Sequence, residues 1–78
     1  MNALRIDEAI ARAKSRGVVV LKKEIAARLW PGIPEVGQQV NMTRLCAGKT
    51  LRIQAEWIPI ICEMTGCSPD FLLGMSND

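Results

Sequence analysis

Residues that stop helices recur along this chain and limit every element to a few turns. Gly17, Gly48, Gly66 and Gly74 each follow a stretch with apolar residues at helical spacing, and Pro31-Gly32 closes another. Glycine readily adopts the left-handed conformation that follows a helix, and proline removes an amide that a continuing helix needs. Apolar residues three and four positions apart form one stripe along a helix. The sequence therefore predicts an all-α fold, a compact bundle of about five short helices.

The first two predicted helices have clear apolar stripes. The first runs from about residue 4 to residue 16, with Ile6, Ala9, Ile10 and Ala13 on its stripe. The second, from residue 21 to residue 29, places Leu21, Ile25 and Leu29 on one face. Residues 18–20 between them are three valines, but no second strand-like run exists to pair with them. We interpret these valines as an apolar connector.

The C-terminal part of the chain predicts two further helices. In QAEWIPIICEMTG, Pro59 delays or bends the first turn, and the apolar stripe consists of Trp57, Ile58, Ile61, Cys62 and Thr65. In SPDFLLG, Ser68 suits the N-cap and Pro69 the first helical position, and Phe71 with Leu72 or Leu73 faces inward. Residues 75–78 are expected to form a frayed tail.

The stretch PEVGQQVNMTRLCAG predicts a helix with an unusual outer face. The helix begins at Pro34, which suits a first helical position, or near Gln38 if Gly37 interrupts it. Met42 and Leu45 supply its buried side. The other side chains can offer hydrogen-bond donors and acceptors to base edges, and only one is charged. They are Gln38, Gln39, Asn41, Thr43 and Arg44.

Gly48-Lys49-Thr50 matches the end of a phosphate-binding P-loop, but its context differs. The complete motif has another glycine five positions earlier, where this chain has Thr43, and it follows a buried strand. No strand-like run precedes the triplet, and no later strand ends in a magnesium-binding Asp. The sequence therefore does not predict a nucleotide site.

Composition narrows the remaining classes of function. Seventy-eight residues make one small domain, residues 1–78, and no apolar stretch approaches the roughly 20 residues that cross a bilayer. Charged residues near the N-terminus argue against a secretory peptide, so we expect a cytoplasmic protein. Three cysteines without any histidine indicate no metal site, and no nucleophile has an activating base. We expect no enzyme, no cofactor, no small-molecule substrate and no membrane partner.

The charge is unevenly distributed along the chain. Residues 1–56 hold all ten Lys and Arg against five acidic residues, whereas residues 57–78 hold three acidic residues and no base. A polyanionic partner of the N-terminal part would explain this distribution, and so would chance asymmetry of a solvated surface.

Three segments together resemble the Cro/CI-type helix-turn-helix domains of phage repressors, the XRE family. KKEIAARL has Ala26 where the family places a small residue at a helix crossing. MTRLCAGKT is similar to the end of the family's recognition helix and the loop after it, and IICEMTGCSPDFLLG is similar to its closing helices. The resemblance implies a lambda-repressor-like fold with the motif at about residues 21–48. It also implies sequence-specific binding of double-stranded DNA by a transcriptional regulator, expected to be a repressor of a phage or mobile element.

The resemblance also implies roles for individual residues. The second helix of the motif lies in the major groove, so the base-reading candidates are Gln38, Gln39, Asn41, Thr43 and Arg44. The phosphate-contact candidates are Lys22, Lys23, Lys49, Thr50 and Arg52. A domain of this size is expected to work as a homodimer on a pseudo-palindromic site. Its dimer surface is expected among exposed parts of residues 57–71.

Two departures from the family pattern affect the connection between the motif helices. Leu21 stands where a capping Ser or Thr is usual, and Trp30 stands where a turn glycine is usual. Residues 30–37 separate the two helices, more than the three or four residues of the ordinary turn. This insertion either extends the recognition helix or forms a loop anchored by Trp30.

A second function remains open from the sequence. The same fold can serve as a protein-interaction module, such as an antitoxin or an anti-repressor, that uses its surface on a protein partner. Binding to DNA fragments distinguishes this alternative from the DNA-binding regulator.

Overall fold

Five α-helices and no strand occupy the part of the chain that the computed structural model describes, residues 4–50 and 52–75. The helices are α1 (Ile6–Ser15), α2 (Lys22–Leu29), α3 (Glu35–Cys46), α4 (Trp57–Thr65) and α5 (Pro69–Leu72). The Cα radius of gyration is 11.7 Å, close to the roughly 11.5 Å of a compact chain of this length. The predicted all-α bundle of short helices is confirmed.

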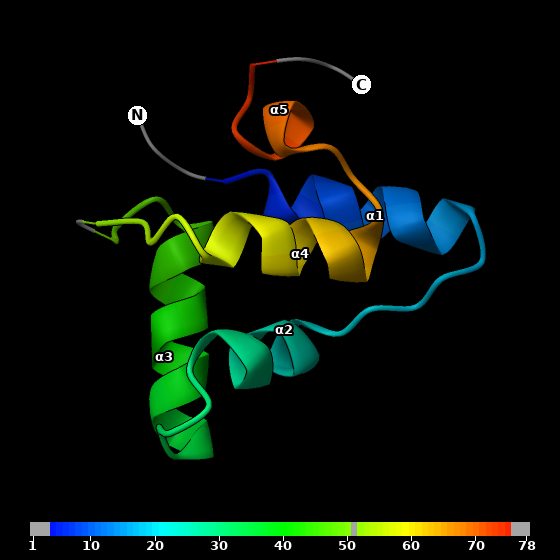
Figure 1. The fold of residues 1–78 in the computed structure, drawn as a ribbon. Coiled ribbons are helices and arrows are strands. Elements are labelled where there is room, and N and C mark those ends of the chain that lie inside the picture. The colour runs from blue at the N-terminus through cyan, green and yellow to red at the C-terminus, as the bar shows by residue number, and fades with distance from the viewer. Residues whose placement is uncertain (1–3, 51, 76–78) are drawn as a thin grey trace.

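The helix α4 lies at the centre of the arrangement. It contacts α1, α2 and α5, while α3 packs against α2. In Figure 1, α1, α2 and α4 run roughly along one direction, and α3 stands across the end of this group. The short α5 lies on the opposite side of α4 from α2. This arrangement leaves one long side of α3 uncovered by any other helix.

Each helix contributes one completely buried isoleucine or leucine side chain to the core. These residues are Ile6, Ile25, Leu45, Ile61 and Leu72. Ala26 is buried as well, and Met42 joins Leu45 on the inner side of α3, as predicted. Burial of such side chains contributes about 1.5 to 3 kcal/mol each relative to exposure. The core therefore fixes which side of each helix faces outward.

The predicted helix ends are confirmed at all four glycines. Gly17, Gly48, Gly66 and Gly74 adopt positive φ angles of 87°, 76°, 78° and 80°. At Gly48 this conformation turns the chain after α3, and the Lys49 amide donates to the carbonyl of Arg44 at 2.9 Å. A residue with a Cβ would be strained there. The backbone of Gly48 and Lys49 thus sets the direction of the chain after α3.

The prediction that Leu21 lies on the buried face of α2 is wrong. Leu21 precedes the helix with extended backbone angles, so the helical spacing does not apply to it, and its side chain is exposed. The Leu21 amide donates to the Glu24 carboxylate at 2.9 Å. Glu24 therefore supplies one half of a capping box, although Leu21 has no hydroxyl for the other half.

The insertion between α2 and α3 combines both predicted outcomes. Residues 30–34 form a loop, and α3 begins at Glu35 and passes through Gly37 without interruption. Pro34 is the N-cap with extended backbone, not the first helical residue as predicted. The Trp30 ring meets the Trp57 ring edge to face at 5.2 Å. The loop is therefore anchored to α4, and α3 is longer at its N-terminus.

The two C-terminal helices form as the sequence predicts. Pro59 falls within the first turn of α4, where a helix needs no amide from it, so the helix is not interrupted. The Ser68 hydroxyl caps α5 by accepting from the Phe71 amide at 3.1 Å. Leu72 faces the core and Leu73 is exposed. Of the predicted tail, Met75 is exposed and residues 76–78 lie outside the described residues.

Candidate functional site

The uncovered side of α3 carries a mixed polar and apolar surface. Val36, Gln39, Val40, Thr43 and Arg44 border a shallow hollow of about 390 Å³ on this side. All five are exposed because they lie away from Met42 and Leu45 around the helix. Three of the predicted base-reading residues, Gln39, Thr43 and Arg44, therefore lie together on one accessible surface, which we call the outer face of α3.

The other two base-reading candidates lie toward the core. Gln38 and Asn41 are half-buried because each is one helical turn from a buried residue, Met42 and Leu45 respectively. The Gln38 amide donates to the Trp30 carbonyl at 2.9 Å, so it secures the loop before α3. This i, i+4 relation to the buried positions was visible in the sequence and separates these two from the outer face.

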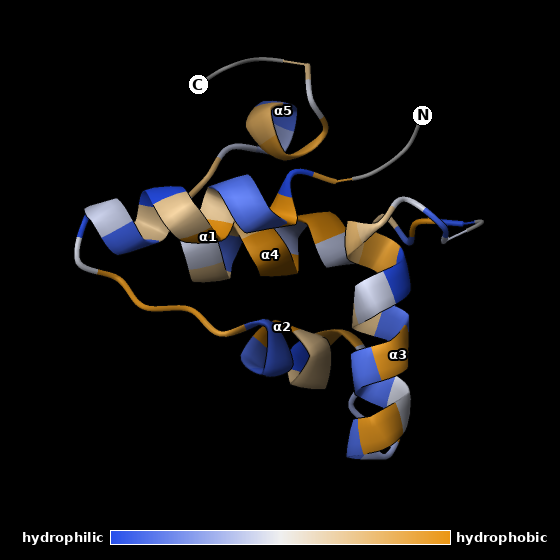
Figure 2. Cartoon of the chain, turned by 180° about the vertical axis from the view of Figure 1, so that it is seen from behind, coloured by the Kyte–Doolittle hydropathy of each residue, from blue (hydrophilic) through white to orange (hydrophobic). Residues whose placement is uncertain are grey.

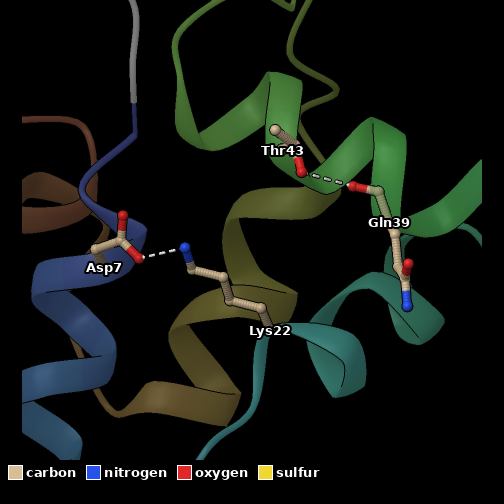
Figure 3. A network of polar contacts seen from close by, with 4 residues as sticks. All are labelled: Asp7, Lys22, Gln39 and Thr43. Carbon is tan, nitrogen blue, oxygen red and sulfur yellow. Dashed lines mark hydrogen bonds and ion pairs between the residues drawn. The ribbon is translucent and has the colours of Figure 1, made fainter.

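The polar groups on the outer face differ in what they can still bind. The Thr43 hydroxyl donates to the Gln39 carbonyl at 2.9 Å, as Figure 3 shows, so its proton is engaged within the helix and its oxygen can only accept. The side chains of Gln39 and Arg44 have no hydrogen-bond partner among residues 4–50 and 52–75. Their amide and guanidinium groups are consequently accessible to a ligand.

A groove of about 580 Å³ runs between α3 and the start of α2. Lys22 and Lys23 line one side of it, and Gln39 and Thr43 line the other. Asp7 of α1 reaches the same groove and pairs with Lys22, with 2.6 Å between the Asp7 Oδ1 and Lys22 Nζ atoms (Figure 3). The hydrogen bond to Asp7 raises the pKa of Lys22. Two of the predicted phosphate-contact residues thus lie beside the outer face of α3.

A second hollow, of about 270 Å³, lies on the opposite flank of α3. It is bordered by Asn41, Arg44, Lys49 and Thr50 together with the two tryptophans. Lys49 is exposed and Thr50 is half-buried. Arg52 is exposed but does not border this hollow. Leu51, between Thr50 and Arg52 in the sequence, is not among the described residues. Cationic side chains therefore flank the outer face of α3 on both sides.

The position of Gly48-Lys49-Thr50 agrees with the interpretation that it is not a P-loop. A P-loop precedes a helix, whose N-terminal amides bind the phosphates. Here the triplet follows the C-terminus of α3, and α4 begins only at Trp57. The backbone groups exposed at that end of α3 are carbonyls rather than amides.

The cysteines lie apart from this surface or below it. Cys46 is half-buried in the floor of the groove, and burial raises its pKa. Cys62 and Cys67 place their sulfur atoms 3.9 Å apart at the end of α4. Burial and the neighbouring Cys67 raise the pKa of Cys62 to about 11. Within the described residues, no three His, Cys, Asp or Glu side chains group as metal ligands would.

In comparisons with known proteins, no family model, curated protein or solved structure matches the chain. The helices of the described residues are also too short or too polar for any of them to span a membrane.

Two features of the surface were missed by the sequence analysis. Val36 and Val40 are 74% and 47% exposed on the outer face of α3, although valine in a helix usually signals a buried side. Their position opposite Met42 and Leu45 around the helix is the signal that would have found them. The pairing of Asp7 with Lys22 joins residues distant in sequence, and no local pattern predicts it.

Proposed function

We propose that this chain is a sequence-specific double-stranded DNA-binding protein of the helix-turn-helix type, with α3 as the helix that enters the major groove. The observation that carries the proposal is the outer face of α3, where Gln39 and Arg44 are accessible between two cationic flanks. The groove with Lys22 and Lys23 lies on one flank, and the hollow with Lys49 lies on the other.

Charge along α3 supports this function. Glu35 is the first residue of α3, and no acidic residue follows it until Glu56, while Arg44, Lys49 and Arg52 fall between them. A helix that enters a major groove passes between two phosphate backbones, so an acid-free outer face with cations on both flanks suits that position. The uncovered side of α3 in Figure 1 provides the necessary access.

The accessible side chains suit base recognition in different ways. The Gln39 amide can pair with adenine N6 and N7, and the Arg44 guanidinium with guanine O6 and N7. Each good bidentate contact discriminates against a wrong base by about 1 to 3 kcal/mol. Gln38 and Asn41 have a lesser role in this proposal, since Gln38 is engaged with Trp30 and both are half-buried.

As a regulator, the protein would act as a homodimer on a pseudo-palindromic operator, because one copy of α3 covers only a few base pairs. Occupation of such a site near a promoter would repress transcription by excluding polymerase, which is the role implied by the resemblance to phage repressors. Exposed parts of residues 57–71, in α4 and α5, remain the proposed surface for the dimer.

A gel-shift experiment tests the proposal directly. The chain is mixed with fragments of its genome, beginning with the DNA upstream of its own gene, in the presence of excess random-sequence competitor. We expect one fragment to be retained selectively. Arg44→Ala is expected to weaken this complex by about 1 to 3 kcal/mol and to relax the preference at one base pair. Equal retention of all fragments, or none, would contradict the proposal.

One observation favours the second candidate, a protein-interaction module such as an antitoxin or anti-repressor. Val36 and Val40 expose apolar surface on the outer face of α3, as a helix that docks on a protein would. If no DNA fragment is retained and a Val40→Asp variant loses a protein partner that the unmodified chain captures, this second function is supported.

A further inference from the structure

The exposed apolar side chains on α3 follow a regular pattern. Val36, Val40 and Thr43 are related by the i, i+4, i+7 spacing that aligns side chains along one side of a helix. Val36 and Val40 are 74% and 47% exposed. Figure 2 shows apolar segments alternating with polar ones along α3. The stripe therefore lies on the outer face and contributes nothing to the core.

Thr43 belongs to this stripe through its methyl group. Its hydroxyl donates to the Gln39 carbonyl at 2.9 Å, so it is occupied within the helix (Figure 3). What remains for an external contact is the methyl group together with the acceptor capacity of the hydroxyl oxygen. The stripe thus presents methyl groups from all three residues, and Gln39 and Arg44 lie beside it at the same shallow hollow.

We infer that the stripe Val36, Val40 and Thr43 recognises the C5-methyl groups of thymine, so that the preferred DNA site holds thymines where α3 enters the major groove. This inference rests on the proposed function. The thymine methyl is the one apolar group that a base pair presents in the major groove, and short apolar side chains contact it there. Accessible valines beside Arg44 and between cationic flanks match that chemistry better than an entirely polar helix would.

The size of the side chains agrees with this assignment. Valine and threonine are short, so the axis of α3 can approach the floor of the groove closely. A protein partner of this stripe would instead have to accommodate the cations that flank it, Lys22, Lys23 and Lys49. A phosphate backbone on each side of the groove complements those charges.

Replacement of thymine by deoxyuridine tests the inference, because it removes the methyl group and leaves every hydrogen-bonding group in place. The preferred duplex is first selected from a library of randomised sequences. Each thymine is then replaced singly, and the dissociation constant is measured. We expect about a fourfold loss of affinity at one or more positions, the factor that corresponds to burial of one methyl-sized group.

Protein variants assign the effect to the stripe. In Val40→Ala, which removes two methyl groups from an exposed position, the deoxyuridine replacement that weakened binding of the unmodified chain is expected to have little effect. Val19→Ala is the matched control, since Val19 is also exposed (70%) but lies on the connector between α1 and α2. It is expected to keep the full fourfold effect. Circular dichroism confirms that both variants retain their helices.

The outcomes separate this inference from the proposed function. Selective binding of a duplex with no loss at any deoxyuridine position overturns the inference and leaves the proposed function intact. A deoxyuridine effect that persists in both Val40→Ala and Val36→Ala overturns the assignment to these residues. If no duplex is selected from the library, the proposed function itself fails. A change of molar mass in solution for Val40→Ala, without a deoxyuridine effect, shows that the stripe joins copies of the chain instead.

Discussion

The carboxylate of Asp7 in α1 lies 2.6 Å from the ammonium group of Lys22 in α2, at the edge of the groove beside α3. Both side chains remain largely exposed, at 66% and 49%. Such a pair contributes at most about 1 kcal/mol to folding because solvent screens it. In the proposed complex with DNA its consequence is greater, since Asp7 occupies the ammonium group that is proposed to bind a phosphate.

Asp7→Asn is therefore expected to strengthen DNA binding. The substitution removes one negative charge from the groove and frees Lys22 for a phosphate. Counterion release predicts that the slope of log affinity against log salt becomes steeper by up to about 0.9. Fluorescence anisotropy with a labelled duplex at several salt concentrations measures the slope. Thermal unfolding is expected to change little.

Two variants control this experiment. Glu8→Gln removes the same charge from the next residue of α1, which is exposed, and is expected to leave the slope nearer that of the unmodified chain. Adding Lys22→Ala to Asp7→Asn is expected to cancel the gain. If the gain in DNA affinity persists without Lys22, Asp7 weakens binding through its long-range charge and not through its pairing with Lys22.

Lys49 is predicted to contact phosphate on the other flank of α3. It is exposed beside Arg44, and the turn at Gly48 fixes its backbone. Lys49→Ala is expected to weaken binding to all DNA sequences about equally and to flatten the salt slope by about 1 unit. Lys14→Ala, at the end of α1 remote from α3, is the matched control and is expected to leave the slope unaltered. Equal slopes for both variants would exclude Lys49 as a phosphate contact.

The sequence predicted the architecture better than the surface. Apolar spacing and the glycines at 17, 48, 66 and 74 determined the helices because both act locally. Leu21 was misassigned because a helical spacing was extended one residue beyond the helix, into an extended N-cap. Gln38 and Asn41 have the chemistry of base-reading residues, but their position relative to Met42 and Leu45 turns them toward the core. The Asp7–Lys22 pair and the Trp30–Trp57 contact depend on tertiary packing, which no local pattern contains.

Gly37 is expected to lower the stability of α3, and the neighbouring Ile33 side chain is expected to prevent its replacement by a better helix former. A Cβ atom added at Gly37 would lie 2.6 Å from the Ile33 Cγ2 atom, which is too close unless Ile33 moves. Alanine in a helix interior is otherwise more favourable than glycine by about 1 kcal/mol. Gly37→Ala alone is therefore expected to be neutral or destabilising.

A double-mutant cycle separates these two effects. In an Ile33→Ala background the obstructing Cγ2 atom is absent, so Gly37→Ala is expected to stabilise the protein by about 0.5 to 1 kcal/mol. Urea denaturation measures the free energy of unfolding of all four proteins. If Gly37→Ala has the same effect in both backgrounds, Ile33 does not restrict this position.

Titration of the Cys62 thiol is expected to lower the stability of the fold as the pH becomes alkaline. Burial, together with the nearby Cys67, raises its pKa from 9.0 to about 11 in the folded protein. Between these values the unfolded chain releases the proton and the folded chain retains it, so unfolding becomes more favourable as pH rises from about 9 to about 11.

Cys62→Ala is expected to reduce this loss of stability. Cys67→Ala, which leaves the Cys62 thiol in place, is expected to reduce it only partly. Thermal unfolding of the three proteins across this pH range measures the difference, and parallel curves would show that the Cys62 thiol titrates alike in the folded and unfolded states.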